Sequence, residues 1–283
     1  MQQESIVGKI IYRLIRKHIA GNTMGSALRK AKSVNMKGIP VSITFLSDNP
    51  DSRAKSSYIT TTYMQLIREL SRLGIKGSVH MQLEQLGSGL SKEIAIENAK
   101  KIIEFGNKYG IFIWLESNKE NNLLAELSSS KGVGAAFSSI ESAEAYYKSY
   151  ISKHRYRMMK VMCKSEVKSK PIDEVNSISK LMDNGKVVLL SPSDSIIEKF
   201  LKNGIKYKKS LIFEFQLGYS EKRLGKWAKK GMGLSMYIPF GKDWVRYTMS
   251  NVPEGYMRSI AGSLLAEKEE KEKKDAKKAK KSA

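Results

Sequence analysis

The chain has 283 residues, of which 41% are hydrophobic and 28% are charged, a balance typical of one large globular domain or two small ones. Its single cysteine, Cys163, excludes an internal disulfide framework or a cysteine-based zinc site and favours a reducing compartment. The net charge of +22 favours anionic partners such as a phosphate-bearing cofactor, nucleic acid or an acidic membrane surface.

The two ends of the chain differ in their patterning. Residues 4–20 carry isoleucines at helical spacing with Lys and Arg on the other face, which predicts a helix that packs on the main domain, with a membrane-surface helix as the alternative. Thr23 can cap a second helix that Gly38 closes, so we expect residues 1–38 to form N-terminal helices. Residues 266–283 have no apolar face and predict a solvated, charged tail, since charge runs rarely form a nucleic-acid arm.

Strand-like and helix-like segments alternate between these ends. Eight apolar segments predict strands: 39–46, 79–83, 111–115, 133–137, 157–162, 187–190, 211–215 and 234–238. Helical patterns follow them at 57–73, 92–109, 121–128, 142–151, 172–182, 195–201, 220–230 and 245–265. Such alternation indicates parallel strands joined by right-handed crossovers. Eight units over residues 39–265 predict a single (β/α)₈ barrel, and the competing doubly wound sheet is weakened because no G-x-G-x-x-G follows the first strand.

Within the predicted strands, aliphatic residues alternate with polar or aromatic ones. Val79, Met81 and Leu83 alternate with His80, Gln82 and Glu84, and 111–116 follow the same pattern. We expect the aliphatic set to meet the helices and the other set to point into the barrel. The predicted mouth comprises Gln82, Trp114, Glu116, Arg157 or Lys160, Glu214, Gln216 and Tyr237. The alternative is a set of interior polar groups that satisfy one another, and the charged members should pair with each other or with a ligand.

Several common catalytic patterns are missing. The three histidines, His18, His80 and His154, sit singly and no close carboxylate cluster accompanies them, so we predict no metal site. Neither a nucleophile elbow nor a P-loop is present. We interpret Cys163 as a small buried hydrophobe rather than as a nucleophile. We expect a cytoplasmic protein with no membrane-spanning segment, and peripheral membrane contact is the alternative.

Six motifs, in order, resemble the proline dehydrogenase family. They are the stretch HIAGNTMGSALRKAKSVNMKGIPVSITFLSDN at 18–49, QLG at 85–87, LES at 115–117, RMMK at 157–160, FEFQLGYS at 213–220 and YIPFGKDWVRYTM at 237–249. The resemblance implies a distorted (β/α)₈ barrel that uses FAD to oxidise proline to pyrroline-5-carboxylate. It also implies that a quinone or another acceptor receives the electrons.

The resemblance carries over to individual residues. It places Arg157, Lys160, Glu214 and Gln216 beside the flavin. It places the catalytic and substrate positions at Lys160, Tyr237, Tyr247 and Glu254. Cations suit a flavin, whose ring becomes negatively charged on reduction.

Other motif positions depart from the family. Ser250 and Asn251 stand where the family has two arginines that grip the proline carboxylate, and Gln82 and Trp114 replace a lysine and an aspartate. Loss of the arginine pair alone should weaken the free energy of substrate binding by about 1.5–3 kcal/mol for each charged hydrogen bond that is lost. Three hypotheses follow: an FAD-dependent dehydrogenase of proline or a related amine; a barrel that has lost proline oxidation and binds another ligand or is non-catalytic; and, from charge alone, a nucleic-acid-associated protein.

Overall fold

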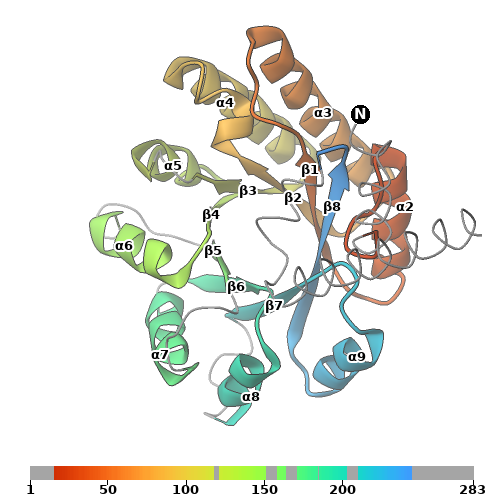
Figure 1. The fold of residues 1–283 in the computed structure, drawn as a ribbon, viewed down its shortest axis with the longest axis vertical. Helices are drawn as coiled ribbons and strands as arrows, with labels where there is room; N and C mark the ends of the chain where they lie inside the picture. Colours follow the sequence, from red (N-terminus) through yellow and green to blue (C-terminus); the bar gives the residue numbers. More distant parts are fainter. Residues whose placement is uncertain are drawn as a thin grey trace, which may run out of the picture. The chain divides into compact units, whose positions relative to one another are not determined.

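A computed structural model describes residues 16–117, 121–150, 158–163, 171–183, 185–202 and 210–243 of the chain. Eight parallel strands form a closed barrel in chain order, and β8 pairs back to β1. Figure 1 shows the helices around the outside of this ring of strands. The predicted (β/α)₈ barrel is therefore confirmed, and the doubly wound alternative is wrong because an open sheet leaves its edge strands unpaired.

The strands agree with the predicted segments to within three residues at each end. They are β1 (Val41–Leu46), β2 (Gly77–Gln82), β3 (Phe112–Glu116), β4 (Val133–Phe137), β5 (Met158–Met162), β6 (Lys186–Leu190), β7 (Leu211–Gln216) and β8 (Gly233–Gly241). The agreement arises because each strand is a short, mostly buried run, often bounded by polar residues or glycine.

The described helices are α2 (Met24–Asn35), α3 (Arg53–Arg72), α4 (Lys92–Tyr109), α5 (Asn121–Ser128), α6 (Ile140–Tyr150), α7 (Pro171–Met182), α8 (Asp194–Lys202) and α9 (Glu221–Lys229). The hydroxyls of Thr23, Ser52 and Ser91 accept hydrogen bonds from the first turns of α2, α3 and α4. The predicted helix at 245–265, the charged tail and most of residues 4–20 lie outside the described residues. The barrel lies within His18–Asp243, which forms one compact unit.

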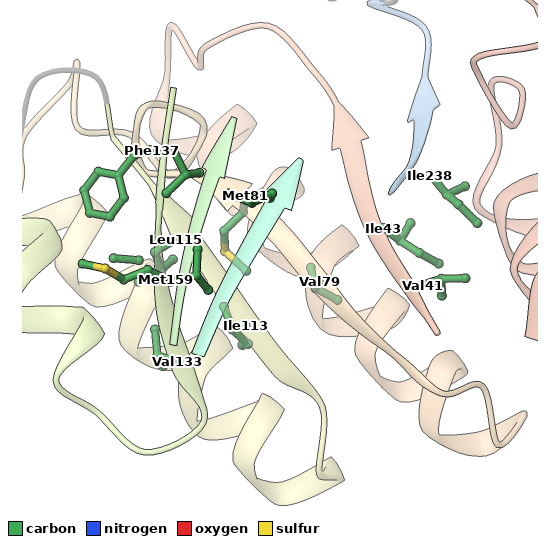
Figure 2. Packing of buried hydrophobic residues seen from close by; sticks show 14 of the residues in the cluster. Val41, Ile43, Val79, Met81, Ile113, Leu115, Val133, Phe137, Met159 and Ile238 are labelled. Atoms are coloured by element: carbon green, nitrogen blue, oxygen red, sulfur yellow. The ribbon is translucent and has the colours of Figure 1, made fainter. Parts of the chain in front are cut away.

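The aliphatic side chains of the strands point outward and pack beneath the helices. Ile43, Val79, Met81 and Leu115 are completely buried there (Figure 2). Complete burial of one such side chain contributes roughly 1.5–3 kcal/mol to folding. Because a shift of one residue would turn the outward set into the lumen, this layer fixes which side chains face the barrel axis.

The alternation in β2 ends earlier than the sequence predicts. The expected continuation through Leu83 and Glu84 is wrong, because a 3₁₀ helix, η1 (Leu83–Leu86), begins directly after Gln82. The Gln85 side chain accepts a hydrogen bond from the Gln82 backbone, and Gly87, with φ of 103°, ends the turn. The chain thus leaves the barrel at Gln82, which becomes the last inward-facing residue of β2.

The N-terminal part of the chain is described from α2 onward. α2 packs against β8 and β1, and the prediction that residues 1–38 as a whole pack on the barrel stays a prediction. Over the described residues, no helix is long and apolar enough to cross a membrane.

Candidate active site

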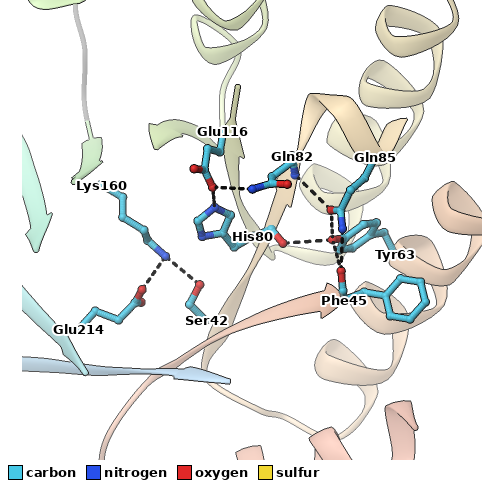
Figure 3. A network of polar contacts seen from close by, with 9 residues as sticks. All are labelled: Ser42, Phe45, Tyr63, His80, Gln82, Gln85, Glu116, Lys160 and Glu214. Atoms are coloured by element: carbon cyan, nitrogen blue, oxygen red, sulfur yellow. Dashed lines mark hydrogen bonds and ion pairs between the residues drawn. The ribbon is translucent and has the colours of Figure 1, made fainter. Parts of the chain in front are cut away.

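A buried ion pair occupies the barrel interior. The Lys160 ammonium on β5 lies 2.8 Å from Glu214 Oε2 on β7, and both side chains are at most 2% exposed (Figure 3). Lys160 also donates to Ser42 Oγ on β1 at 2.9 Å, and Ser235 Oγ on β8 donates to Glu214 Oε1 at 3.1 Å. Four strands therefore contribute to one interaction, which joins opposite parts of the barrel. The sequence predicted that the charged lumen residues would pair with each other or with a ligand, and Lys160 and Glu214 pair with each other.

Two aromatic rings cover the same ammonium. Lys160 Nζ lies 4.7 Å from the centre of the Trp114 ring and 5.7 Å from that of Tyr237, distances typical of cation–π contacts. Trp114 fits because residue 134 is glycine: a Cβ there would lie 2.6 Å from Trp114 Cζ3. Trp114 Nε1 donates to Ser78 Oγ at 3.2 Å. Trp114 is only 3% exposed, so it fills the lumen rather than lining an open mouth.

The local environment changes the acidity of Lys160. Burial lowers the pKa of its ammonium below the usual value, and the charge and hydrogen bond of Glu214 oppose that shift. The pair as a unit is neutral, and its hydrogen bonds to Ser42 and Ser235 reduce the cost of holding two charges away from water.

A second polar group lies on the neighbouring strands β2 and β3. His80 Nε2 is 3.0 Å from Glu116 Oε2, and Gln82 Nε2 donates to the same oxygen at 3.4 Å (Figure 3). The His80 ring meets the Tyr237 ring edge-on, with centres 5.5 Å apart. His80 and Glu116 are 3% and 7% exposed. His80, which stands alone in the sequence, therefore has a carboxylate partner in the fold.

The sequence predicted that these side chains face the lumen, but it did not predict which of them are in contact. In the barrel Gln82 is in register with Glu116, and His80 is in register with Trp114. All four belong to the inward-facing sets of their strands. The strand alternation placed them in the lumen, and only the register between β2 and β3 shows that His80 reaches Glu116.

Protonation within this second group follows from burial. Burial is the main cause that lowers the pKa of His80, and the Lys160 charge adds to it, while Glu116 opposes. Burial alone would raise the pKa of Glu116, but the hydrogen bonds from His80 and Gln82 and the charge of Lys160 bring it below the usual value. At neutral pH the imidazole is therefore uncharged, and its Nε2–H donates to the Glu116 carboxylate.

This arrangement leaves one imidazole atom unsatisfied. With the proton on Nε2, Nδ1 of His80 is a hydrogen-bond acceptor, and it is buried without a partner among the described residues. By contrast, Glu214 Oε2 is engaged, because it is the oxygen that pairs with the Lys160 ammonium at 2.8 Å.

The carboxyl ends of the strands offer neutral hydrogen-bonding groups. Gln82 ends β2 and Gln216 ends β7, and both side chains are partly exposed. Such amides suit the polar edge of a flavin ring. Within the described residues, however, the one lumen cation, Lys160, is already paired, so the positive charge that favours a reduced flavin is not supplied there. The remaining predicted site residues, Arg157, Tyr247, Ser250, Asn251 and Glu254, lie outside the described residues.

Comparisons with known proteins point to one group of enzymes. No protein-family model matches the chain. Proline dehydrogenase 1 of Bacillus subtilis subsp. natto is 22% identical over 259 residues, covering 84% of this chain and 86% of the relative. Proline dehydrogenase of Deinococcus radiodurans is 22% identical over 282 residues, covering 89% and 90%.

Solved structures show the same relationship at the level of the fold. Proline utilization A from Bdellovibrio bacteriovorus, inactivated by N-propargylglycine, superimposes with a TM-score of 0.69 at 15% identity. The match covers 83% of this chain but only 32% of that longer protein. A Bradyrhizobium japonicum proline utilization A mutant gives a TM-score of 0.66 at 13% identity and is covered to 31%. The chain is therefore a divergent relative of the proline dehydrogenases, in sequence along most of its length and in the fold of its barrel, as its motifs predicted.

Proposed function

We propose that this chain is a flavin-dependent oxidoreductase of the proline dehydrogenase type, which oxidises proline or a related secondary amine. The observation that carries the proposal is the contact between Lys160 and Glu214. These residues belong to the motifs RMMK and FEFQ, which lie more than fifty positions apart in the sequence, and the fold brings them to 2.8 Å. The similarity to curated proline dehydrogenases over 84% of the chain supports the same reaction class.

The residues have distinct proposed roles. FAD, when bound, supplies the acceptor for a hydride from the carbon next to the substrate nitrogen. Gln82 and Gln216 would hydrogen-bond the edge of the flavin ring at the carboxyl ends of β2 and β7. The Lys160–Glu214 ion pair would lie in the lumen beneath the flavin ring, and the Tyr237 ring would form one side of the site. Roles for Arg157 beside the flavin, and for Tyr247 and Glu254 beside the substrate, rest on the motifs alone.

The proposal includes the partners of the reaction and its compartment. The reduced flavin would pass its electrons to a quinone or another acceptor, and the enzyme would work in the cytoplasm, with peripheral contact to a membrane if the acceptor is a membrane quinone. The small-molecule substrate enters from the end of the barrel at which the strands terminate, where enzymes with this fold have their active sites.

An absorption spectrum of the purified full chain, recorded with and without added FAD and then with L-proline under anaerobic conditions, tests the proposal. The expected result is a protein-bound flavin band near ~450 nm that bleaches on addition of L-proline. A protein that binds no flavin after reconstitution contradicts the proposal. Bound flavin that stays oxidised with proline but is reduced by another secondary amine keeps the reaction class and changes the substrate.

A second candidate is a barrel that has kept the fold and lost proline oxidation. The observation in its favour is Trp114, which fills lumen space at a position where the family has an aspartate, together with Ser250 and Asn251 in place of the two arginines. The variant Trp114→Ala distinguishes the two. If the tryptophan blocks a lost site, its removal should create flavin or amine binding that the unaltered chain does not have.

A further inference from the structure

The charges in the barrel lumen do not balance among the described residues. Lys160 contributes one positive charge, and Glu214 and Glu116 contribute one negative charge each. Because burial keeps His80 uncharged at neutral pH, one negative charge is left over, and it lies on Glu116. An uncompensated buried charge is costly, so this end of the lumen favours one additional positive charge, which could be a proton or a cationic ligand.

The same end of the lumen holds an unsatisfied acceptor. His80 is 3% exposed and its Nδ1 has no hydrogen-bond partner in the described part of the chain. A buried polar atom without a partner costs about 1–3 kcal/mol. A donor N–H placed there would satisfy Nδ1 and would bring positive charge within reach of Glu116. A single cationic N–H group at His80 would therefore both satisfy Nδ1 and offset the negative charge of Glu116.

The imidazole is held as a general base would be. Its Nε2–H is fixed by the Glu116 carboxylate at 3.0 Å, which selects the tautomer whose lone pair lies on Nδ1. The Gln82 amide donates a hydrogen bond to Glu116, and the Tyr63 hydroxyl on α3, whose shortest contact is with Gln85 Oε1 at 2.9 Å, lies 3.3 Å from the His80 carbonyl oxygen. A base oriented by a carboxylate on its far nitrogen is the arrangement that also orients histidine in hydrolytic triads.

The groups that face His80 determine whether its imidazole is protonated. Glu116 on β3 and Glu214 on β7 favour the protonated imidazole, whereas Lys160 on β5 and burial disfavour it. Tyr237 on β8 contributes its ring edge. Lys160 does not compete as a base, because its ammonium is paired with Glu214 and hydrogen-bonded to Ser42. Among the described lumen residues, His80 therefore offers a buried nitrogen, Nδ1, that can accept a proton.

We infer that the His80–Glu116 pair binds the charged nitrogen of a secondary-amine substrate and accepts its proton before oxidation. The inference rests on the proposed function, because it identifies the base of that reaction. An N–H bond of the ammonium breaks, the proton bonds to Nδ1, and the electron pair stays on the substrate nitrogen. The neutral amine can then lose a hydride from the adjacent carbon to the flavin, which gives an iminium ion, and the imidazolium later returns its proton to water.

The first test follows His80 directly, in the full chain labelled with ¹⁵N-histidine. The probe is pyrrolidine, a secondary amine that is cationic at neutral pH, and the matched probe is tetrahydrofuran, which has the same ring without the charge. We expect a neutral His80 at pH 7, protonated on Nε2, whose Nδ1 signal shifts with pyrrolidine and not with tetrahydrofuran. The variant His80→Gln assigns the signal. A His80 that is charged at pH 7, or that ignores pyrrolidine, overturns the inference.

The second test follows the rate of flavin reduction by L-proline between about pH 5 and pH 8. The rate should rise with pH through the His80 pKa. His80→Gln keeps a donor for Glu116 but cannot accept a proton, so the rate at pH 7 should fall at least tenfold and the inflection should disappear. The control is His18→Gln, since the His18 ring contacts the Leu217 carbonyl at 2.8 Å and its replacement should leave the profile unchanged.

The two tests separate the failure of the inference from that of the proposed function. An unaltered pH profile in His80→Gln, with flavin reduction intact, overturns the inference alone. No flavin reduction in the unaltered chain contradicts the proposed function, and the ¹⁵N experiment, which needs no flavin, still decides whether His80 binds the amine.

Discussion

Two acid–base pairs share one barrel but differ in how completely their atoms are satisfied. Lys160–Glu214 has an opposite charge, a hydroxyl at each end and two aromatic covers. Counted over the described residues, His80–Glu116 has a neutral member, an excess negative charge and an acceptor without a partner. The first pair joins strands that are not neighbours and has its charges matched, whereas the second leaves an acceptor that a ligand could satisfy. Burial alone therefore does not tell a structural pair from a reactive one.

The largest effect should come from breaking the satisfied pair. Glu214→Ala leaves the Lys160 ammonium buried and unpaired, so the free energy of unfolding should fall by about 3–5 kcal/mol, measured by urea denaturation. The double variant Lys160→Met/Glu214→Leu removes both charges and should recover most of that loss. A loss below about 1 kcal/mol in the single variant would mean that the ammonium finds water or another partner.

A smaller effect should come from the unsatisfied pair. Glu116→Ala leaves behind a neutral imidazole N–H and the Gln82 amide rather than a charge, so the expected loss in the free energy of unfolding is about 1–3 kcal/mol. Glu116→Gln, which keeps an acceptor for His80, is the matched control and should lose less. If Glu116→Ala proves as damaging as Glu214→Ala, the contrast between the two pairs is wrong.

The pH dependence of stability should separate the two pairs further. The pKa of His80 is lowered in the folded chain, so as pH falls below about 6.5 the unfolded chain takes up this proton and the folded chain does not. Stability should therefore decrease on acidification through this range, by at most about 1.4 kcal/mol per pH unit from this residue. Urea denaturation at several pH values should show this component in the unaltered chain and in His18→Gln, and not in His80→Gln. If stability instead increases from pH 7 to pH 5 and this increase depends on His80, folding raises the pKa of His80 rather than lowering it.

The smallest effect is expected at the surface. Lys101 contacts Glu97 at 2.7 Å on α4, with both side chains more than half exposed. Lys101→Ala should leave the midpoint of urea denaturation almost unchanged, because water screens the pair. A loss comparable to that of Glu214→Ala would show that burial is not what separates strong pairs from weak ones in this chain.

The sequence predicted the outer layer of the barrel well and the inner layer only in part. Aliphatic residues such as Ile43 and Val79 repeat every second position, and that period is a local property of the chain. The contact between Lys160 and Glu214 depends on the stagger of strands that are not neighbours, and no local pattern encodes it. His80 was missed because its partner is set by the register between β2 and β3. The early end of β2 was missed because Leu83 continues the alternation of apolar residues, although the backbone there has already turned from a strand into the 3₁₀ helix η1.

The most direct test of the account is the electron density of a crystal of the full chain grown with FAD. We expect the flavin ring at the carboxyl ends of the strands, with its polar edge within hydrogen-bonding distance of Gln82 or Gln216 and the Lys160–Glu214 pair intact in the lumen. Flavin bound at another surface, or a barrel end that stays free of flavin at saturating concentration, would contradict the proposal that this barrel is a flavin enzyme.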